Sequence, residues 1–159
     1  MKFNFYALRA IYLHEMDRFR RTLLQSLLSP VLSTSLYFIV FGSVIGDYVE
    51  SIDGLSYGSY IVPGLLMLTL LTQSISNTSF GIFFPKFNGT IYEILAAPIS
   101  TFEVVLAFVG AGATKTLIVG VVIFVTSLFF VDVTVKYPLL MIFLLVLVAF
   151  TFALFGFLI

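Results

Sequence analysis

Long stretches without a charged residue most constrain what this chain can fold into. The four longest uncharged runs, of 25, 32, 16 and 23 residues, are 22–46, 54–85, 116–131 and 137–159. A helix needs about 20 apolar residues to cross a membrane. The third run reaches that length only if its helix begins before Lys115. Composition agrees, since 60% of residues are hydrophobic and 10% are charged, against about half and a quarter in a soluble domain.

The runs predict helices rather than strands. The strands of a membrane barrel alternate apolar and polar residues, and LYFIVFGSVI and LLMIFLLVLVAF do not alternate. A helix also satisfies its own backbone polar groups in lipid. We therefore expect an all-α membrane protein with about four transmembrane helices. The expected spans are about 23–46, 59–84, 108–131 and 138–159, within a transmembrane domain covering 23–159.

Several classes of chemistry lack their residues here. There is no cysteine and a single histidine, His14, so thiolate sites, cysteine nucleophiles and histidine-based metal sites are not expected. Neither HExxH nor G-x-S-x-G occurs. The net charge is zero, and no basic patch suggests nucleic acid. No span carries a pair of ionisable groups, which argues against a proton-coupled transporter. We expect neither an enzyme nor a cofactor in this chain.

Residues 1–22 predict an amphipathic helix. Aromatic and aliphatic side chains recur at helical spacing to form one stripe, at Phe5, Leu8, Tyr12, Met16 and Phe19. Charged and polar side chains take the far side, at His14, Asp17, Arg18 and Arg21. Such a helix lies in the membrane interface. The alternative is a plain cytosolic extension of the first span.

The distribution of charge predicts the orientation in the membrane. Five of the eight basic residues precede the first span, and the loop after it is acidic, with Asp47, Glu50 and Asp53. The positive-inside rule then puts the N-terminus in the cytoplasm. The loop around Tyr48 to Ser59 and the VDVTVKY turn are expected outside, and the loop at 85–100 inside.

The inner loop, PKFNGTIYEILAAPIS, predicts a short, separate helix. Thr90 and Glu93 have the spacing of a capping box, and Pro98 ends the helix that follows, Ile91 to Ala97. Ser100 and Glu103 repeat the spacing and would begin the next long helix. Apolar side chains on a cytoplasmic helix indicate contact with lipid or with a partner protein; here they are Tyr92, Ile94 and Leu95.

The stretch VGAGATKT, residues 109–116, looks like a phosphate-binding loop but lacks its pattern. The G-x-x-x-x-G-K-[ST] motif needs a glycine directly before the lysine, and Thr114 stands there. We interpret the stretch as part of the long helix. Small residues four apart, Gly112, Thr116 and Gly120, predict close helix packing. Lys115 is then either a basic anchor at the inner interface or a side chain facing a water-filled path.

Polar side chains gather in the second span. They are Gln73, Ser74, Ser76, Asn77, Thr78 and Ser79. One interpretation is hydrogen bonding between helices. The other is a translocation path for an amphiphilic substrate.

Taken together, three stretches resemble ABC-2 type transporter permeases. They are FIVFGSVIGDY, YIVPGLLMLTLL and GTIYEILAAPISTFEVVLAFVGAGATK. The recurring loop pattern of that family, an acidic residue, Leu-x-Ala/Thr-Pro and a small polar residue, matches Glu93, Leu95, Ala97, Pro98 and Ser100. The basic amphipathic N-terminus is similar too, so the resemblance covers essentially the whole chain.

The resemblance implies a membrane subunit of a bacterial ATP-driven exporter in the inner membrane. Such permeases pair as dimers, homodimers here, and dock onto a separate ATP-binding subunit that binds the ATP. The helix of the inner loop would be the coupling helix, with Thr90, Tyr92, Glu93, Ile94, Leu95 and Pro98 as its partner-binding residues. The family has six spans, so we expect this chain to be truncated at its C-terminus. A membrane anchor or assembly protein, and less so a secondary transporter, are the alternatives.

Overall fold

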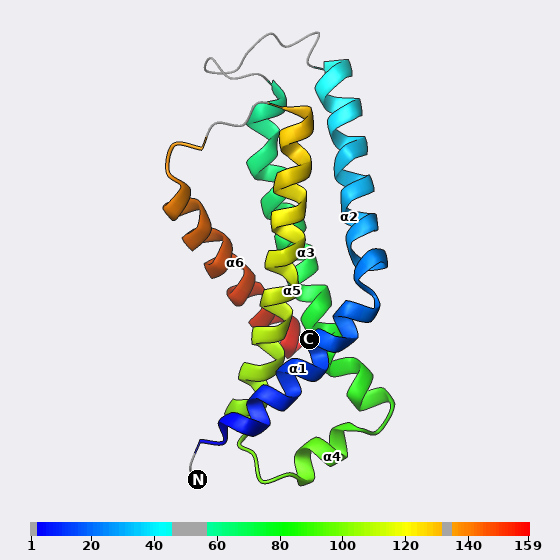
Figure 1. Ribbon diagram of the computed structural model, residues 1–159, viewed down its shortest axis with the longest axis vertical. Coiled ribbons are helices and arrows are strands. Elements are labelled where there is room, and N and C mark those ends of the chain that lie inside the picture. The colour runs from blue at the N-terminus through cyan, green and yellow to red at the C-terminus, as the bar shows by residue number, and fades with distance from the viewer. Residues whose placement is uncertain (1–2, 46–56, 132–134) are drawn as a thin grey trace.

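The protein is described by a computed structural model that covers residues 3–45, 57–131 and 135–159. Within these ranges it contains helices and no strand. In chain order the elements are α1 (Phe5–Arg21), α2 (Leu23–Tyr37), the π-helix η1 (Phe38–Ile45), α3 (Tyr57–Phe87), α4 (Ile91–Ala96), α5 (Thr101–Phe130) and α6 (Pro138–Leu158). Figure 1 shows their arrangement.

Four helical segments in the described ranges are long and apolar enough to cross a membrane. They are Leu23–Phe41, Tyr57–Phe87, Thr101–Phe130 and Pro138–Leu158. The predicted fold class, an all-α membrane protein with four transmembrane helices, is confirmed. The amphipathic N-terminal segment is helical as expected and precedes the first of them as α1.

The long helices α3 and α5 form the centre of the molecule. Helix α6 packs against both, and α2 packs against α5. Helix α1 crosses one end of the bundle against α5, and α4 lies beyond that end, in the connection between α3 and α5 (Figure 1). The N-terminal helix and the loop helix therefore lie at the same end of the bundle.

Small residues set how closely the central helices approach. A Cβ added at Gly112 would lie 2.0 Å from Thr78 Oγ1, and one at Gly120 would lie 2.8 Å from Leu70 Cδ2. Thr116, one turn from each, is fully buried and donates to the Gly112 carbonyl oxygen. All three residues predicted to pack thus lie in the face of α5 that meets α3.

Three polar residues of α3 hydrogen-bond to neighbouring helices. The Ser74 hydroxyl donates to the Ala149 carbonyl oxygen of α6 at 2.5 Å, and the Ser79 hydroxyl donates to the Gly156 carbonyl oxygen at 2.7 Å. The Asn77 amide donates to Thr116 of α5 at 3.3 Å. These three side chains support the first of the two interpretations of the polar residues, hydrogen bonding between helices.

The two predicted capping boxes have different outcomes. The box at Ser100 and Glu103 is present and begins α5. The box at Thr90 is wrong: Thr90 has helical backbone angles (φ −63°, ψ −15°), and its side chain makes no capping bond within the described residues. A capping side chain needs an extended backbone to reach the N3 amide. The Glu93 amide instead donates to the Thr90 carbonyl oxygen at 3.2 Å.

The second span is longer than predicted at its C-terminal end. Helix α3 continues through Pro85 to Phe87, past the expected end at residue 84. The chain then turns at Gly89, whose φ of +78° lies in the left-handed region that glycine adopts at no steric cost.

Some predictions lie outside the described residues. They concern the acidic loop after the first span, which falls mostly in residues 46–56, and the centre of the VDVTVKY turn, residues 132–134.

The contact between α3 and α6 predicts a sharp effect of one added methyl group. A Cβ at Gly156 would lie 2.5 Å from the backbone oxygen of Ile75 and 2.8 Å from its Cα. Backbone atoms inside a helix cannot move aside, so we expect Gly156→Ala to lower the free energy of unfolding by about 1–3 kcal/mol, the usual cost of overpacking. The measurement is SDS titration of the purified protein followed by circular dichroism.

Gly64→Ala is the matched control, because nothing lies within 4 Å of its added Cβ. It should leave stability unchanged or raise it by up to about 1 kcal/mol through helix propensity. Equal behaviour of the two variants would contradict the close contact of α3 and α6.

Candidate functional site

The loop helix α4 is held by the bundle on one face. Ile91 and Ile94 pack, with Ile99 after the helix, against a buried cluster of Ile82, Val104 and Phe108 from α3 and α5. Ile11 of α1 packs against the same cluster. The position of α4 thus depends on three other helices.

The other face of α4 is open. Tyr92 is 74% exposed and Leu95 is 65% exposed, and Thr90, Glu93 and Pro98 are exposed too. Of the residues predicted to bind a partner, these five remain accessible, whereas Ile94 is half-buried toward the core. Phe87 before α4 and Phe102 after it are also exposed. The end of the bundle therefore presents large apolar side chains on a short, well-supported helix.

Helix α1 is joined to α5 at intervals along its length. The backbone amide of Asn4 donates to Oε1 of Glu103, and the Tyr12 hydroxyl donates to Thr114 Oγ1 at 3.1 Å. These contacts pair residues about 100 positions apart in the same order, so the two helices run in the same direction. Glu103 also accepts from the Ser100 amide at 2.8 Å. One carboxylate thus ties the start of α1 to the start of α5.

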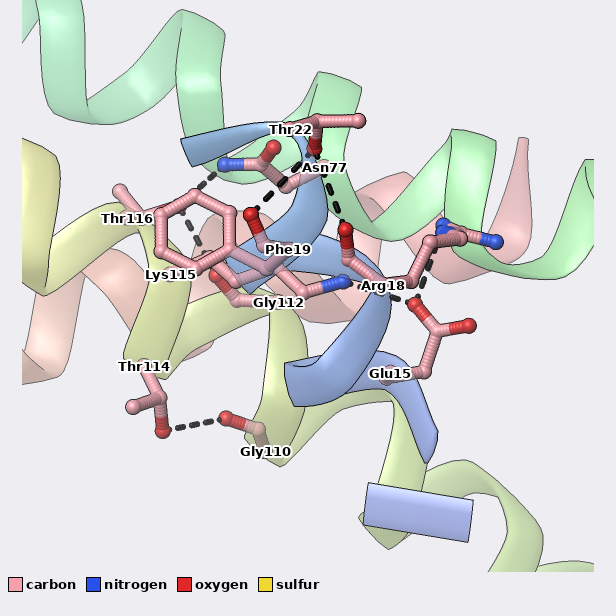
Figure 2. A network of polar contacts seen from close by, with 10 residues as sticks. All are labelled: Glu15, Arg18, Phe19, Thr22, Asn77, Gly110, Gly112, Thr114, Lys115 and Thr116. Atoms are coloured by element: carbon pink, nitrogen blue, oxygen red, sulfur yellow. Dashed lines mark hydrogen bonds and ion pairs between the residues drawn. The ribbon is translucent and has the colours of Figure 1, made fainter. Parts of the chain in front are cut away.

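The third contact is a buried ion pair. Lys115 Nζ of α5 lies 2.7 Å from Oε2 of Glu15 in α1, and the two side chains are 4% and 2% exposed. Arg18 Nη2 reaches the same oxygen at 3.0 Å. Figure 2 shows the Lys115 and Arg18 side chains converging on Glu15. The Arg18 guanidinium also lies over the ring of Phe84 in α3, 5.6 Å from its centroid.

Removing the Glu15 carboxylate would leave Lys115 buried without a counter-charge, whereas removing Lys115 would leave Glu15 paired with Arg18. An unpaired charge in a protein interior is far costlier than a paired one. Oε1 of Glu15 is buried and has no hydrogen-bond donor among the described residues. The carboxylate therefore depends on Lys115 and Arg18, and Lys115 depends on the carboxylate. Lys115 therefore has its counter-charge only when α1 is packed against α5.

The ion pair bears on one of the two interpretations of Lys115. Its side chain is 4% exposed and its ammonium group is paired with Glu15, so among the described residues it does not face an open path. It lies 14 residues into α5, about 21 Å along the helix axis at 1.5 Å per residue.

The face of α1 that meets the protein also differs from the predicted stripe. Phe19 is buried and Tyr12 is half-buried, but Phe5 is 60% exposed. Arg18, placed on the far side by the sequence pattern, contacts Glu15 and Phe84 instead.

Glu15 is the residue that sequence reasoning missed, although a local signal existed. It lies three residues after Tyr12 and four before Phe19, on the same face of a helix. An acidic side chain within an apolar stripe indicates a buried partner, and Lys115 is the basic residue in the interior of the third span.

The glycine-rich stretch at 109–116 lies within α5, as predicted. Most of its residues are buried against neighbouring helices. Its backbone amides are those of a continuous helix and so bond to carbonyl groups of the preceding turn.

These features define the class: a multi-pass helical membrane protein with an amphipathic N-terminal helix and a helical loop at the same end of the bundle. A family model described as ABC-2 type transporter matches residues 6–159. The chain belongs to the ABC-2 type transporter family, which confirms the resemblance stated from its motifs.

Three curated relatives agree with the family match. Each is described as "Inner membrane transport permease YadH", from Escherichia coli strain K12, Escherichia coli O157:H7 and Shigella flexneri. Each is 39% identical to this chain over 150 residues, which cover 94% of this chain and 59% of the relative. The chain thus spans about three fifths of the length of these relatives. No solved structure matches it.

The ion pair predicts an asymmetric response to substitution. Glu15→Gln leaves Lys115 buried without a carboxylate, so the free energy of unfolding should fall by about 3–5 kcal/mol. Lys115→Met should cost clearly less, because Glu15 keeps Arg18 at 3.0 Å. SDS titration followed by circular dichroism measures both.

Asp17→Asn is the matched control on the same helix. Asp17 pairs with Arg20 at 3.8 Å, with the two side chains 65% and 78% exposed. An exposed pair contributes under about 1 kcal/mol. If Asp17→Asn lowered the free energy of unfolding as much as Glu15→Gln, the buried cluster would contribute no more to stability than an exposed ion pair.

Proposed function

We propose that this chain forms the transmembrane part of a transport permease driven by a separate ATP-binding subunit, and that it works in export. The observation that carries the proposal is α4: a short helix whose half-buried isoleucines pack on the bundle on one face and whose other face is open. Family membership and the relatives' name, transport permease, support it.

The partner surface is the open face of α4. Tyr92 and Leu95 supply apolar area, and Glu93 supplies a charge that orients an incoming protein. Aromatic residues with a polar end are favoured at such interfaces. The ATP is bound by the partner subunit, and this chain transmits its effect. A second copy of the permease completes the transport unit.

The proposed location is the inner membrane of a bacterium, with the N-terminus, α1 and α4 in the cytoplasm. The basic residues before the first span support this orientation. The name of the relatives, inner membrane transport permease, supports the membrane.

Substitution on the open face of α4 tests the partner. Tyr92→Asp in the full-length protein should weaken binding of the ATP-binding subunit at least about 30-fold, the effect of losing a hot-spot residue worth roughly 2 kcal/mol. The measurement is titration of the detergent-solubilised permease with the purified subunit.

Tyr137→Asp is the matched control. Tyr137 is 73% exposed, against 74% for Tyr92, and it precedes α6, away from α4 (Figure 1). The Tyr137→Asp variant should bind the ATP-binding subunit with the same dissociation constant as the parent protein. If Tyr92→Asp bound equally well, α4 would not be the docking helix.

Reporter fusions test the orientation. Alkaline phosphatase, which is active only outside the cytoplasm, should be inactive when fused after Asn88 and active when fused after Tyr137. The reverse pattern would place α4 on the outer side and exclude contact with a cytoplasmic ATP-binding subunit.

A further inference from the structure

The buried cluster of Glu15, Arg18 and Lys115 joins α1, at the end of the bundle where α4 lies, to the central helix α5 (Figure 1). Glu15 and Lys115 join α1 to α5 where both side chains are excluded from solvent. Residues 15 and 115 are distant in the chain, so the contact forms only when α1 has docked. The ion pair fixes both the presence and the register of that docking, because a shift of α1 by one residue turns Glu15 away by about 100°.

Helices α1 and α4 pack against the same buried cluster. Ile11 of α1 contacts the cluster of Ile82, Val104 and Phe108 on which Ile91 and Ile94 of α4 also pack. At the other end of the connection, the Asn4 amide bonds to Glu103, the residue that caps α5 directly after α4. Helix α1 thus meets the loop that carries α4 in two places: at the cluster that both helices share, and at Glu103, where the loop ends and α5 begins.

We propose that the Glu15–Lys115 ion pair is the lock that positions α1, and through it α4, for contact with the ATP-binding subunit. Glu15 and Lys115 are positioning residues, since neither reaches the open face of α4. The proposal rests on the proposed function for the identity of the partner. The effect of the Glu15–Lys115 ion pair on the position of α4 is measurable without any partner.

Paired spin labels measure that placement. Residues 1–159 contain no cysteine, so cysteines introduced at exposed Tyr6 of α1 and Ala96 of α4 are labelled specifically in the full-length protein, with any cysteine outside this range replaced by serine. The parent should give one narrow distance distribution. Glu15→Gln should at least double its width, and Glu15→Lys combined with Lys115→Glu should narrow it again. Labels at Leu68 of α3 and Phe143 of α6, both exposed, should show no change.

A stability control separates positioning from general destabilisation. Gly156→Ala disturbs the contact of α3 with α6, since the three atoms nearest to the added Cβ all belong to Ile75 of α3. It should therefore lower stability and leave the distribution of distances from α1 to α4 narrow. Binding of the ATP-binding subunit should fall at least tenfold in unlabelled Glu15→Gln, recover in the charge-swapped double variant, and remain within twofold of the parent in Gly156→Ala.

The outcomes separate the two proposals. If the distribution of α1–α4 label distances is unchanged in Glu15→Gln, or is broadened equally by Gly156→Ala, the ion pair does not position α4. This conclusion holds whether or not the subunit binds. If Glu15→Gln broadens the distribution and the charge-swapped double variant narrows it again, the proposed positioning role of the ion pair is supported. If Tyr92→Asp binds the subunit like the parent, the proposed docking helix fails, and the label distances alone decide whether the ion pair positions α4.

Discussion

One carboxylate, Glu15, contacts two cations, Lys115 and Arg18, through the same oxygen atom. Lys115 is buried in the middle of a packed membrane helix, and an unpaired ammonium group there would be prohibitively costly. Its partner comes from the first helix of the chain, 100 residues earlier. The amphipathic N-terminal helix is therefore an integral part of the bundle rather than an appendage on its surface.

The burial of Lys115 is what makes that charge pair necessary, because a side chain that is 4% exposed has almost no water to solvate its charge. The bundle is tightly packed elsewhere too. Gly112 and Gly120 allow α5 to approach side chains of α3 closely, and Gly156 allows α6 to approach the α3 backbone. The same closeness lets Ser74 and Ser79 donate to carbonyl oxygens of a neighbouring helix. Small residues and paired polar groups are two results of the same close approach.

The sequence predicted the spans well because the bilayer leaves a polypeptide few choices. Backbone groups in lipid must bond internally, so length and hydropathy suffice to predict helices at α3 and α6. Helix α5 begins at Thr101, before the expected start of the third span at residue 108, and includes the charged residues Glu103 and Lys115. Ser100 was also predictable, because its partner Glu103 is three residues away. Glu15 stands out locally as an acidic residue within an apolar stripe, but its partner Lys115 is 100 residues away and is set by tertiary packing. Thr90 failed for the opposite reason: a correct local spacing was overridden by the backbone that leaves the turn at Gly89.

The two faces of α1 explain why its pattern was partly misleading. A hydrophobic stripe on a helix near a membrane can face lipid or protein, and both environments favour the same side chains. In α1, Phe19 faces protein, while Phe5 is exposed. What distinguishes the protein face is Glu15, since a carboxylate directed at lipid has no partner, whereas one directed at Lys115 does. A charged residue within an apolar stripe is thus evidence for helix packing, and its partner is best sought among isolated charges of opposite sign in the spans.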